Sequence, residues 1–103
     1  MDSTLEVKTR RLLVAHGLAG FTRELPLDWN GRTDRYDFAF AGQRTMLETN
    51  GCRWHHDPTD DERDQAKRSV PARHGFRLVF ATRETVTRRP GALIAELRAA
   101  LAA

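Results

Sequence analysis

The chain has 103 residues, of which 40% are apolar and 30% are charged. This length leaves room for one domain with a modest core, and the apolar fraction is too high for a mainly disordered chain. We therefore expect residues 1–103 to form a single domain. The formal net charge of +3 permits a polyanionic partner without requiring one. All basic residues except Lys8 and Lys67 are arginines, which suits bidentate contacts with phosphate but is equally explained by codon bias.

The sequence also bears on the compartment. Cys52 is the only cysteine, so an intramolecular disulfide and a four-cysteine metal centre are both excluded. The N-terminal residues are acidic and polar where a signal peptide needs a basic start and an apolar stretch, and no run reaches membrane-spanning length. We expect a soluble protein of the cytoplasm.

A first helix is predicted from a cap at Asp2 or Ser3 to about His16, because leucines recur at helical spacing and Gly17 follows. Glu6 lies on the flank of this apolar stripe, where it can face the edge of the core. Its charge could equally favour the helix N-terminus.

Three short strands follow. Residues 21–27 alternate between apolar and polar side chains, and Pro26 either restricts this strand to an edge or ends it. Asn30-Gly31 predicts a tight turn. The next strand, over residues 35–40, is expected to carry its aromatic side chains on one face: Tyr36, Phe38 and Phe40. A turn at residues 41–42 then leads into a strand over residues 45–48, which completes a three-stranded antiparallel meander.

The C-terminal half adds helices and one more strand. Residues 51–58 form a loop, and a helix capped by Thr59 or Asp60 should kink or break at Pro71. The short apolar run 76–82 is typical of a buried strand that joins the sheet in parallel after a helical crossover. A last helix begins at residues 90–91. The fold class is therefore mixed α/β, with one mixed sheet flanked by helices.

Asp37 is the most unusual residue of this pattern, because a carboxylate within a strand is disfavoured and costly to bury without a partner. The turn at residues 41–42 brings the next strand back, so that Glu48 can approach Asp37 on the same face. Two such carboxylates repel each other unless a proton or a cation lies between them, and their oxygens suit Mg²⁺ or Mn²⁺. Salt bridges to nearby arginines are an alternative explanation of equal weight.

The segment that follows Glu48 carries a family resemblance. Its motifs are Glu48-x-Asn50-Gly51, the run Gly-Cys-Arg-Trp-His-His at residues 51–56, Tyr-Asp-Phe at residues 36–38, Gly-Phe-Arg-Leu-Val at residues 75–79 and Val-Thr-Arg-Arg-Pro at residues 86–90. These motifs resemble those of the Vsr-like endonucleases, the family of the very-short-patch repair enzyme and of many small bacterial proteins. The resemblance extends from about Glu6 to the C-terminus.

This resemblance implies a restriction-endonuclease-like core with a PD-(D/E)xK-type metal site and hydrolysis of DNA phosphodiesters. Asp37 and Glu48 would be carboxylate ligands of Mg²⁺ or Mn²⁺, and the main-chain carbonyl of Thr49 would be a further ligand. Glu6 would hold metal-bound water, and His55 would act as general base or proton carrier.

Several positions depart from the family pattern. Asn50 stands where such nucleases usually carry lysine, aspartate or histidine, and its amide neither titrates nor carries a charge. Asn50 would then orient water, or Lys67 would supply the missing cation; Lys67 is otherwise a solvated or phosphate-facing residue. Pro71 and Arg68 replace an apolar residue and an acid. The structural zinc cysteines of the repair enzyme are absent, so mismatch recognition is not implied.

Other interpretations of single residues stay open. Cys52, His55 and His56 could form a partial zinc site, although three such ligands within five residues give poor tetrahedral geometry. Trp54 fits a core position better than a base-stacking one. The arginines near residues 83–89 are expected to form a solvated surface or, second, a clamp on DNA.

Three functions are therefore weighed. The first is a metal-dependent DNA endonuclease or nickase acting on double-stranded DNA. The second is a catalytically weak or inactive DNA-binding or regulatory module, favoured by Asn50. The third, a remote one, is an antitoxin-like interaction domain. The sequence is compatible with a monomer or a homodimer, and a core of this size suggests modest sequence specificity or a targeting partner protein.

Overall fold

The computed structural model describes residues 3–50 and 69–103. Its elements are α1 (Ser3–Ala15), β1 (Thr22–Trp29), β2 (Arg32–Phe40), the 3₁₀ turn η1 (Ala41–Gln43), β3 (Thr45–Asn50), β4 (Arg77–Thr82), α3 (Arg83–Arg88) and α4 (Pro90–Ala102). Residues 69–73 are also helical.

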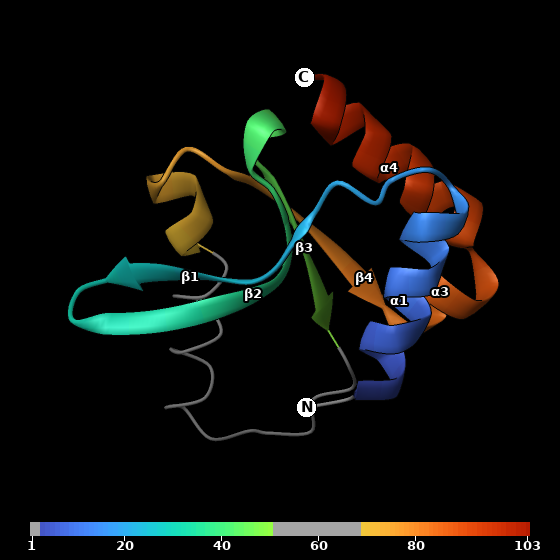
Figure 1. Ribbon diagram of the computed structural model, residues 1–103, viewed down its shortest axis with the longest axis horizontal. Helices are drawn as coiled ribbons and strands as arrows, with labels where there is room; N and C mark the ends of the chain where they lie inside the picture. The colour runs from blue at the N-terminus through green and yellow to red at the C-terminus, as the bar shows by residue number, and fades with distance from the viewer. Residues whose placement is uncertain (1–2, 51–68) are drawn as a thin grey trace.

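The four strands form one mixed sheet in the order β1-β2-β3-β4. Strand β2 pairs antiparallel with both β1 and β3, whereas β3 and β4 are parallel. The predicted meander and the parallel fourth strand are confirmed. The predicted mixed sheet flanked by helices is thus the observed fold class (Figure 1).

The hairpin of β1 and β2 follows from local sequence signals. Asn30 and Gly31 both have positive φ, 51° and 78°, as a two-residue turn with matching twist requires. Pro26 lies in β1, at the edge of the sheet, where its missing N–H breaks no ladder. Both features agree with the sequence-based expectation.

Helices α1, α3 and α4 cover one face of the sheet (Figure 1). We call the apolar cluster between them the main core; its buried members are Leu5, Leu13, Phe38, Phe40, Leu47, Val79, Ala81, Val86, Leu93, Ile94 and Leu97. On α1 the buried stripe includes Thr9, whose hydroxyl donates to the carbonyl of Leu5 at 2.7 Å. Gly17, with φ 74°, ends the turn after α1 as predicted.

A second core lies on the opposite face of the sheet and is formed by Leu27, Tyr36, Ala39, Met46 and Val70. The expectation that Tyr36 and Phe38 share a face is therefore wrong, since Phe38 belongs to the main core. The β1–β2 ladder pairs Arg23 with Phe38 and Leu25 with Tyr36 but has no pair between them. Glu24 there has a positive φ of 53°. This local break interrupts the alternation of side chains along β2.

Helix α3 was not expected from the sequence. It begins at a capping box in which the Thr82 hydroxyl accepts from the Thr85 N–H, while the Thr85 hydroxyl accepts from the Thr82 N–H. Helix α4 begins at Pro90 as predicted.

Pro71 lies within the helical residues 69–73, whereas the rest of the helix predicted from Thr59 or Asp60 falls outside the described residues. Among the described residues, no helix has both the length and the apolar character needed to cross a membrane.

Candidate active site

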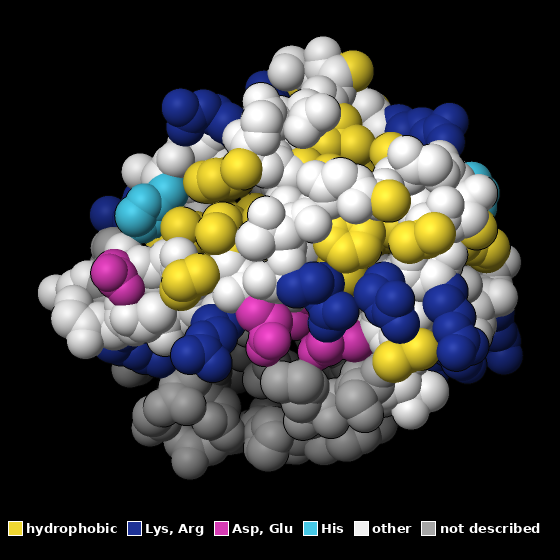
Figure 2. Space-filling model, viewed as in Figure 1, with side chains coloured by type: hydrophobic (Ala, Val, Ile, Leu, Met, Phe, Trp, Pro, Cys, Tyr) yellow, Lys and Arg dark blue, Asp and Glu magenta, His cyan; other side chains and the backbone are white. Residues whose placement is uncertain are grey.

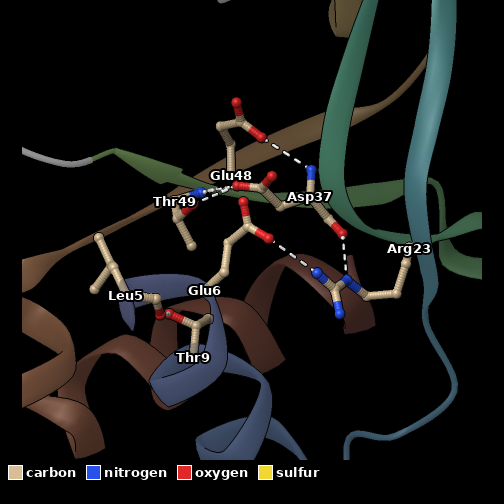
Figure 3. Close-up of polar contacts among 7 residues, drawn as sticks. All are labelled: Leu5, Glu6, Thr9, Arg23, Asp37, Glu48 and Thr49. Atoms are coloured by element: carbon tan, nitrogen blue, oxygen red, sulfur yellow. Dashed lines mark hydrogen bonds and ion pairs between the residues drawn. The ribbon is translucent and has the colours of Figure 1, made fainter. Parts of the chain in front are cut away.

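Three acidic residues from three elements lie around the end of β3: the carboxyl groups of Glu6 and Asp37 are neighbours, whereas the carboxylate of Glu48 contacts the backbone N–H of Asp37. Glu6 comes from the first turn of α1, Asp37 from the middle of β2, and Glu48 from β3. Figure 3 shows Asp37 between the other two. The register explains part of this arrangement, since Phe38 pairs with Leu47, so Asp37 and Glu48 occupy the next position of the antiparallel pair.

The carboxylate of Asp37 is oriented by Thr49. Its Oδ2 atom accepts a hydrogen bond from the Thr49 N–H at 2.9 Å and a second one from the Thr49 hydroxyl. Both donors are supplied by β3, directly after Glu48. The contact fixes the side chain of Asp37 at the edge where β2 and β3 diverge.

Glu48 is buried, with 6% of its surface exposed. Its Oε1 atom accepts a hydrogen bond from the backbone N–H of Asp37 at 2.9 Å. The backbone pairing of β2 with β3 stops at this position, so the Asp37 N–H has no carbonyl partner on β3. The Glu48 carboxylate accepts its hydrogen bond instead, and this N–H is therefore satisfied.

Glu6 lies beside Asp37 with only 12% of its side chain exposed. Burial raises the pKa of Glu6 above its ordinary value of 4.5. The negative charge of Asp37 and a hydrogen bond with that carboxyl group raise this pKa further, whereas Arg23 lowers it. The neighbouring carboxyl groups of Glu6 and Asp37 favour a shared proton or a cation, an effect that the sequence analysis expected of Asp37 and Glu48 instead.

Arg23 is a site residue that the sequence analysis missed. Its Nη2 donates to Glu6 Oε2 at 2.9 Å, and its Nε donates to the backbone carbonyl of Asp37 at 3.3 Å (Figure 3). The guanidinium lies over the ring of Phe38, with 4.9 Å from Cζ to the ring centroid. The sequence held one hint of this role, because Arg23 occupies a position of β1 at which the alternating pattern places apolar side chains.

The sequence analysis offered salt bridges to arginine as an alternative to a bound cation. Among the three acidic residues, Glu6 has such a salt bridge, with Arg23. The guanidinium of Arg23 meets Asp37 at its backbone carbonyl, and the carboxylate of Asp37 is bound by Thr49 instead. The described contacts thus link Glu6, Thr49 and Glu48 to Asp37.

The remaining predicted residues are not placed. His55 and Lys67 lie outside the described residues, as do Cys52, Trp54 and His56. Asn50 is the last residue of β3 and pairs with Thr82 of β4, but its side chain is not among the described parts.

The chemistry of the donor atoms bears on metal binding. Within the described ranges, no group of three or more histidine, cysteine, aspartate or glutamate side chains is arranged to hold an ion. Mg²⁺, however, is commonly bound by one or two carboxylates and keeps several waters. Asp37, Glu48 and a main-chain carbonyl provide only oxygen donors, which fit a hard divalent cation, and such a cation would also relieve the repulsion between Asp37 and Glu6.

The mixed four-stranded sheet with helices on one face is similar to the fold of a solved nuclease catalytic domain. That structure is the catalytic domain of the homing endonuclease I-Bth0305I. It matches with a TM-score of 0.69 over 96% of this chain and 97% of that domain. Because the sequence identity is 15%, the likeness establishes the fold alone.

Two relatives are similar in sequence. The uncharacterized proteins MT2308 and Rv2248 of Mycobacterium tuberculosis, from strains CDC 1551 and H37Rv, are each 28% identical over 97 residues, which is 93% of this chain. The chain spans 36% of the length of these relatives. No protein-family model matches the sequence.

Proposed function

We propose that the protein is a metal-dependent DNA endonuclease of the Vsr-like, PD-(D/E)xK type, which hydrolyses or nicks phosphodiester bonds of double-stranded DNA. One observation carries this proposal: the carboxyl groups of Glu6 of α1 and Asp37 of β2 are neighbours, and the Glu48 carboxylate of β3 contacts the backbone of Asp37. Carboxylates gathered in this way are costly for stability alone, so a catalytic use explains their presence.

The described residues have distinct roles in this proposal. Asp37 and Glu48, with the main-chain carbonyl of Thr49, would hold Mg²⁺ or Mn²⁺. The ion, when bound, supplies charge neutralisation at the phosphate and a lower pKa for bound water. The Thr49 hydroxyl orients the Asp37 carboxylate, and Glu6 accepts hydrogen bonds from water at the edge of the site.

Three further residues complete the proposal, His55 by resemblance to the family motif and the other two as replacements where the sequence departs from that motif. His55 would take up or deliver a proton as general base, because an imidazole titrates near neutral pH. Asn50 would orient water through its amide, or Lys67 would supply the cation that such sites usually carry beside the acids. We further propose that residues 1–103 act as one catalytic domain, in the cytoplasm and as a monomer or homodimer. A partner protein would direct the domain to its sites.

Plasmid nicking tests the proposal. We expect wild-type protein to convert supercoiled plasmid to open-circle or linear DNA with Mg²⁺ or Mn²⁺ and to lose this activity with EDTA. Replacement of the ligand Asp37 (Asp37→Asn) should lower the rate by more than about 100-fold, because even the loss of a hydrogen-bond partner of a metal ligand costs roughly 10–100-fold.

The matched control is Asp34→Asn, which removes the same charge from the same strand at a position opposite Leu27 in β1. This variant should cleave at nearly the wild-type rate. Cleavage that survives Asp37→Asn unchanged would show that the site is elsewhere.

A second candidate is a DNA-binding module without cleavage. The observation in its favour is that the carboxylates already have protein partners: Thr49 for Asp37, the Asp37 N–H for Glu48, and Arg23 for Glu6. DNA binding by the wild type without nicking at any Mg²⁺ or Mn²⁺ concentration would favour this function.

A further inference from the structure

We propose that Arg23 anchors a phosphate-binding subsite next to Glu6 and Asp37 and takes a non-bridging oxygen of the DNA backbone. This inference rests on the proposed function, since it assigns a substrate contact within the same site. No motif of the sequence marks Arg23; only its contacts do.

The guanidinium of Arg23 is held in place before any ligand arrives. Two donors on one edge are used by the protein, Nη2 by Glu6 at 2.9 Å and Nε by the carbonyl of Asp37 at 3.3 Å. The ring of Phe38 supports the guanidinium plane. Phe38 is itself fully buried and packs edge-to-face against Phe21, with ring centroids 5.0 Å apart. Such preorganisation lowers the entropic cost of binding a ligand.

The outer edge of the guanidinium, formed by Nη1 and the second N–H of Nη2, is available. The side chain is 38% exposed, and it makes no other hydrogen bond to the described residues. Because guanidinium has five N–H donors and two are used, the donors of the outer edge can bind a phosphate in bidentate fashion.

The positive charge of Arg23 would favour the approach of DNA to the acidic residues. Carboxylates repel a phosphodiester, so a substrate can approach Asp37 and Glu6 only if positive charge lies close by. Arg23 supplies that charge in direct contact with Glu6. Figure 2 shows acidic side chains at the centre of one surface with basic side chains beside them. The charge pattern thus suits a backbone that crosses the acidic site between cations.

The backbone of β1 has an unusual conformation next to Arg23. Glu24 adopts φ 53° directly after Arg23, at the point where the β1–β2 ladder has no pair opposite Asp37. A non-glycine residue in this region costs of order 1–3 kcal/mol and recurs at ligand sites. The break brings Arg23 and Asp37 into contact across the strands.

The test measures affinity and its salt dependence with a fluorescein-labelled DNA duplex in EDTA, where wild-type protein does not cleave. Replacing the guanidinium with an uncharged amide (Arg23→Gln) should weaken binding about 10–100-fold, the loss expected for one charge-assisted hydrogen-bonded contact. The slope of log affinity against log salt should fall by about 0.9, as for one lost phosphate contact. Arg23→Lys keeps the charge and should therefore keep the slope while losing part of the affinity.

Arg98→Gln is the matched control, because Arg98 also donates to a backbone carbonyl, that of His16 at 2.9 Å, beyond the opposite end of α1. It should keep the wild-type slope, or lose less of it than Arg23→Gln. Thermal unfolding should show all variants folded.

An unchanged affinity and slope in folded Arg23→Gln, or no DNA binding by wild-type protein, would overturn the subsite. Loss of cleavage with an unchanged slope would also overturn it, since Arg23 would then only position Glu6. The proposed nuclease function fails separately, if wild-type protein binds the duplex but never nicks plasmid; a lower slope in Arg23→Gln would then still support the subsite.

Discussion

Glu6 lies where a charged carboxylate is disfavoured, since burial and the neighbouring Asp37 both raise its pKa. The ion pair with Arg23 offsets this only in part, because the guanidinium is more than one third exposed and solvent screens such a pair. The charge of Glu6 therefore opposes folding at neutral pH. In the proposed function, the loss of folding stability is tolerated because Glu6 holds water at the active site.

A neutral isostere at this position should therefore stabilise the protein. A pKa raised in the folded state means that stability is highest below the ordinary value of 4.5 and falls as pH rises through the folded-state pKa. Glu6→Gln removes this loss. We expect a higher free energy of unfolding than wild type at pH 7 in metal-free buffer, and a difference that shrinks when urea titrations are repeated below pH 4.5.

Glu84→Gln serves as the control for this measurement. It breaks the exposed ion pair with Arg89 at 2.6 Å and should change stability by less than about 0.5 kcal/mol. If Glu6→Gln were less stable than wild type at pH 7, the ion pair with Arg23 would outweigh burial and repulsion.

The turns are the elements whose residues dictate their geometry most directly. Asn30 and Gly31 together adopt the positive φ values that a two-residue hairpin requires, and the register from Trp29↔Arg32 onward depends on this turn. The turn thereby sets which residues of β2 lie opposite β1, Phe38 opposite Arg23 included.

Two alanine substitutions separate backbone conformation from packing at the turns. A Cβ atom would meet nothing within 4 Å at either Gly31 or Gly42, but only Gly31 has a positive φ. Gly31→Ala should lower the free energy of unfolding by about 1–2 kcal/mol. Gly42→Ala should change it by less than about 0.5 kcal/mol. Equal effects in urea denaturation would show that φ at Gly31 is not the cause.

The parts of the fold that the sequence could predict are those that depend on residues close together in the chain. Proline and glycine fix geometry within a few residues, so the edge strand at Pro26 and the turn at residues 30–31 were foreseeable. Helix α3 was not, because its cap is a pair of threonines without the acidic residue of the usual signature. The opposite faces of Tyr36 and Phe38 depend on a break at Glu24 in the neighbouring strand, which alternation within β2 cannot report.

At the scale of the molecule, the site joins a helix to two strands. Asp37 and Glu48 were predictable as neighbours because a short turn connects their strands. Glu6 was placed by the family resemblance, and Arg23 was missed because its partners, Glu6 and Asp37, lie on other elements. Tertiary contacts of this kind leave only a weak trace in a single sequence.

Binding of a divalent ion should stabilise the whole fold, because an ion that binds only the native state shifts the unfolding equilibrium. We expect Mn²⁺ to raise the melting temperature of wild-type protein, by the equivalent of about 2.7 kcal/mol at 100 times its Kd. The shift should vanish in Asp37→Asn and persist in Asp34→Asn. Equal shifts in both variants would place the ion elsewhere.

The parallel pairing of β3 with β4 has a consequence for the order of folding. The two antiparallel hairpins close over short loops, whereas β3 and β4 can pair only after residues 51–76 have been brought round. Asp37 and Glu48 can thus become neighbours early, in a local hairpin. Glu6 and the main core join them only once α1, α3 and α4 dock, so the complete candidate site should form late, in the same step as cooperative burial.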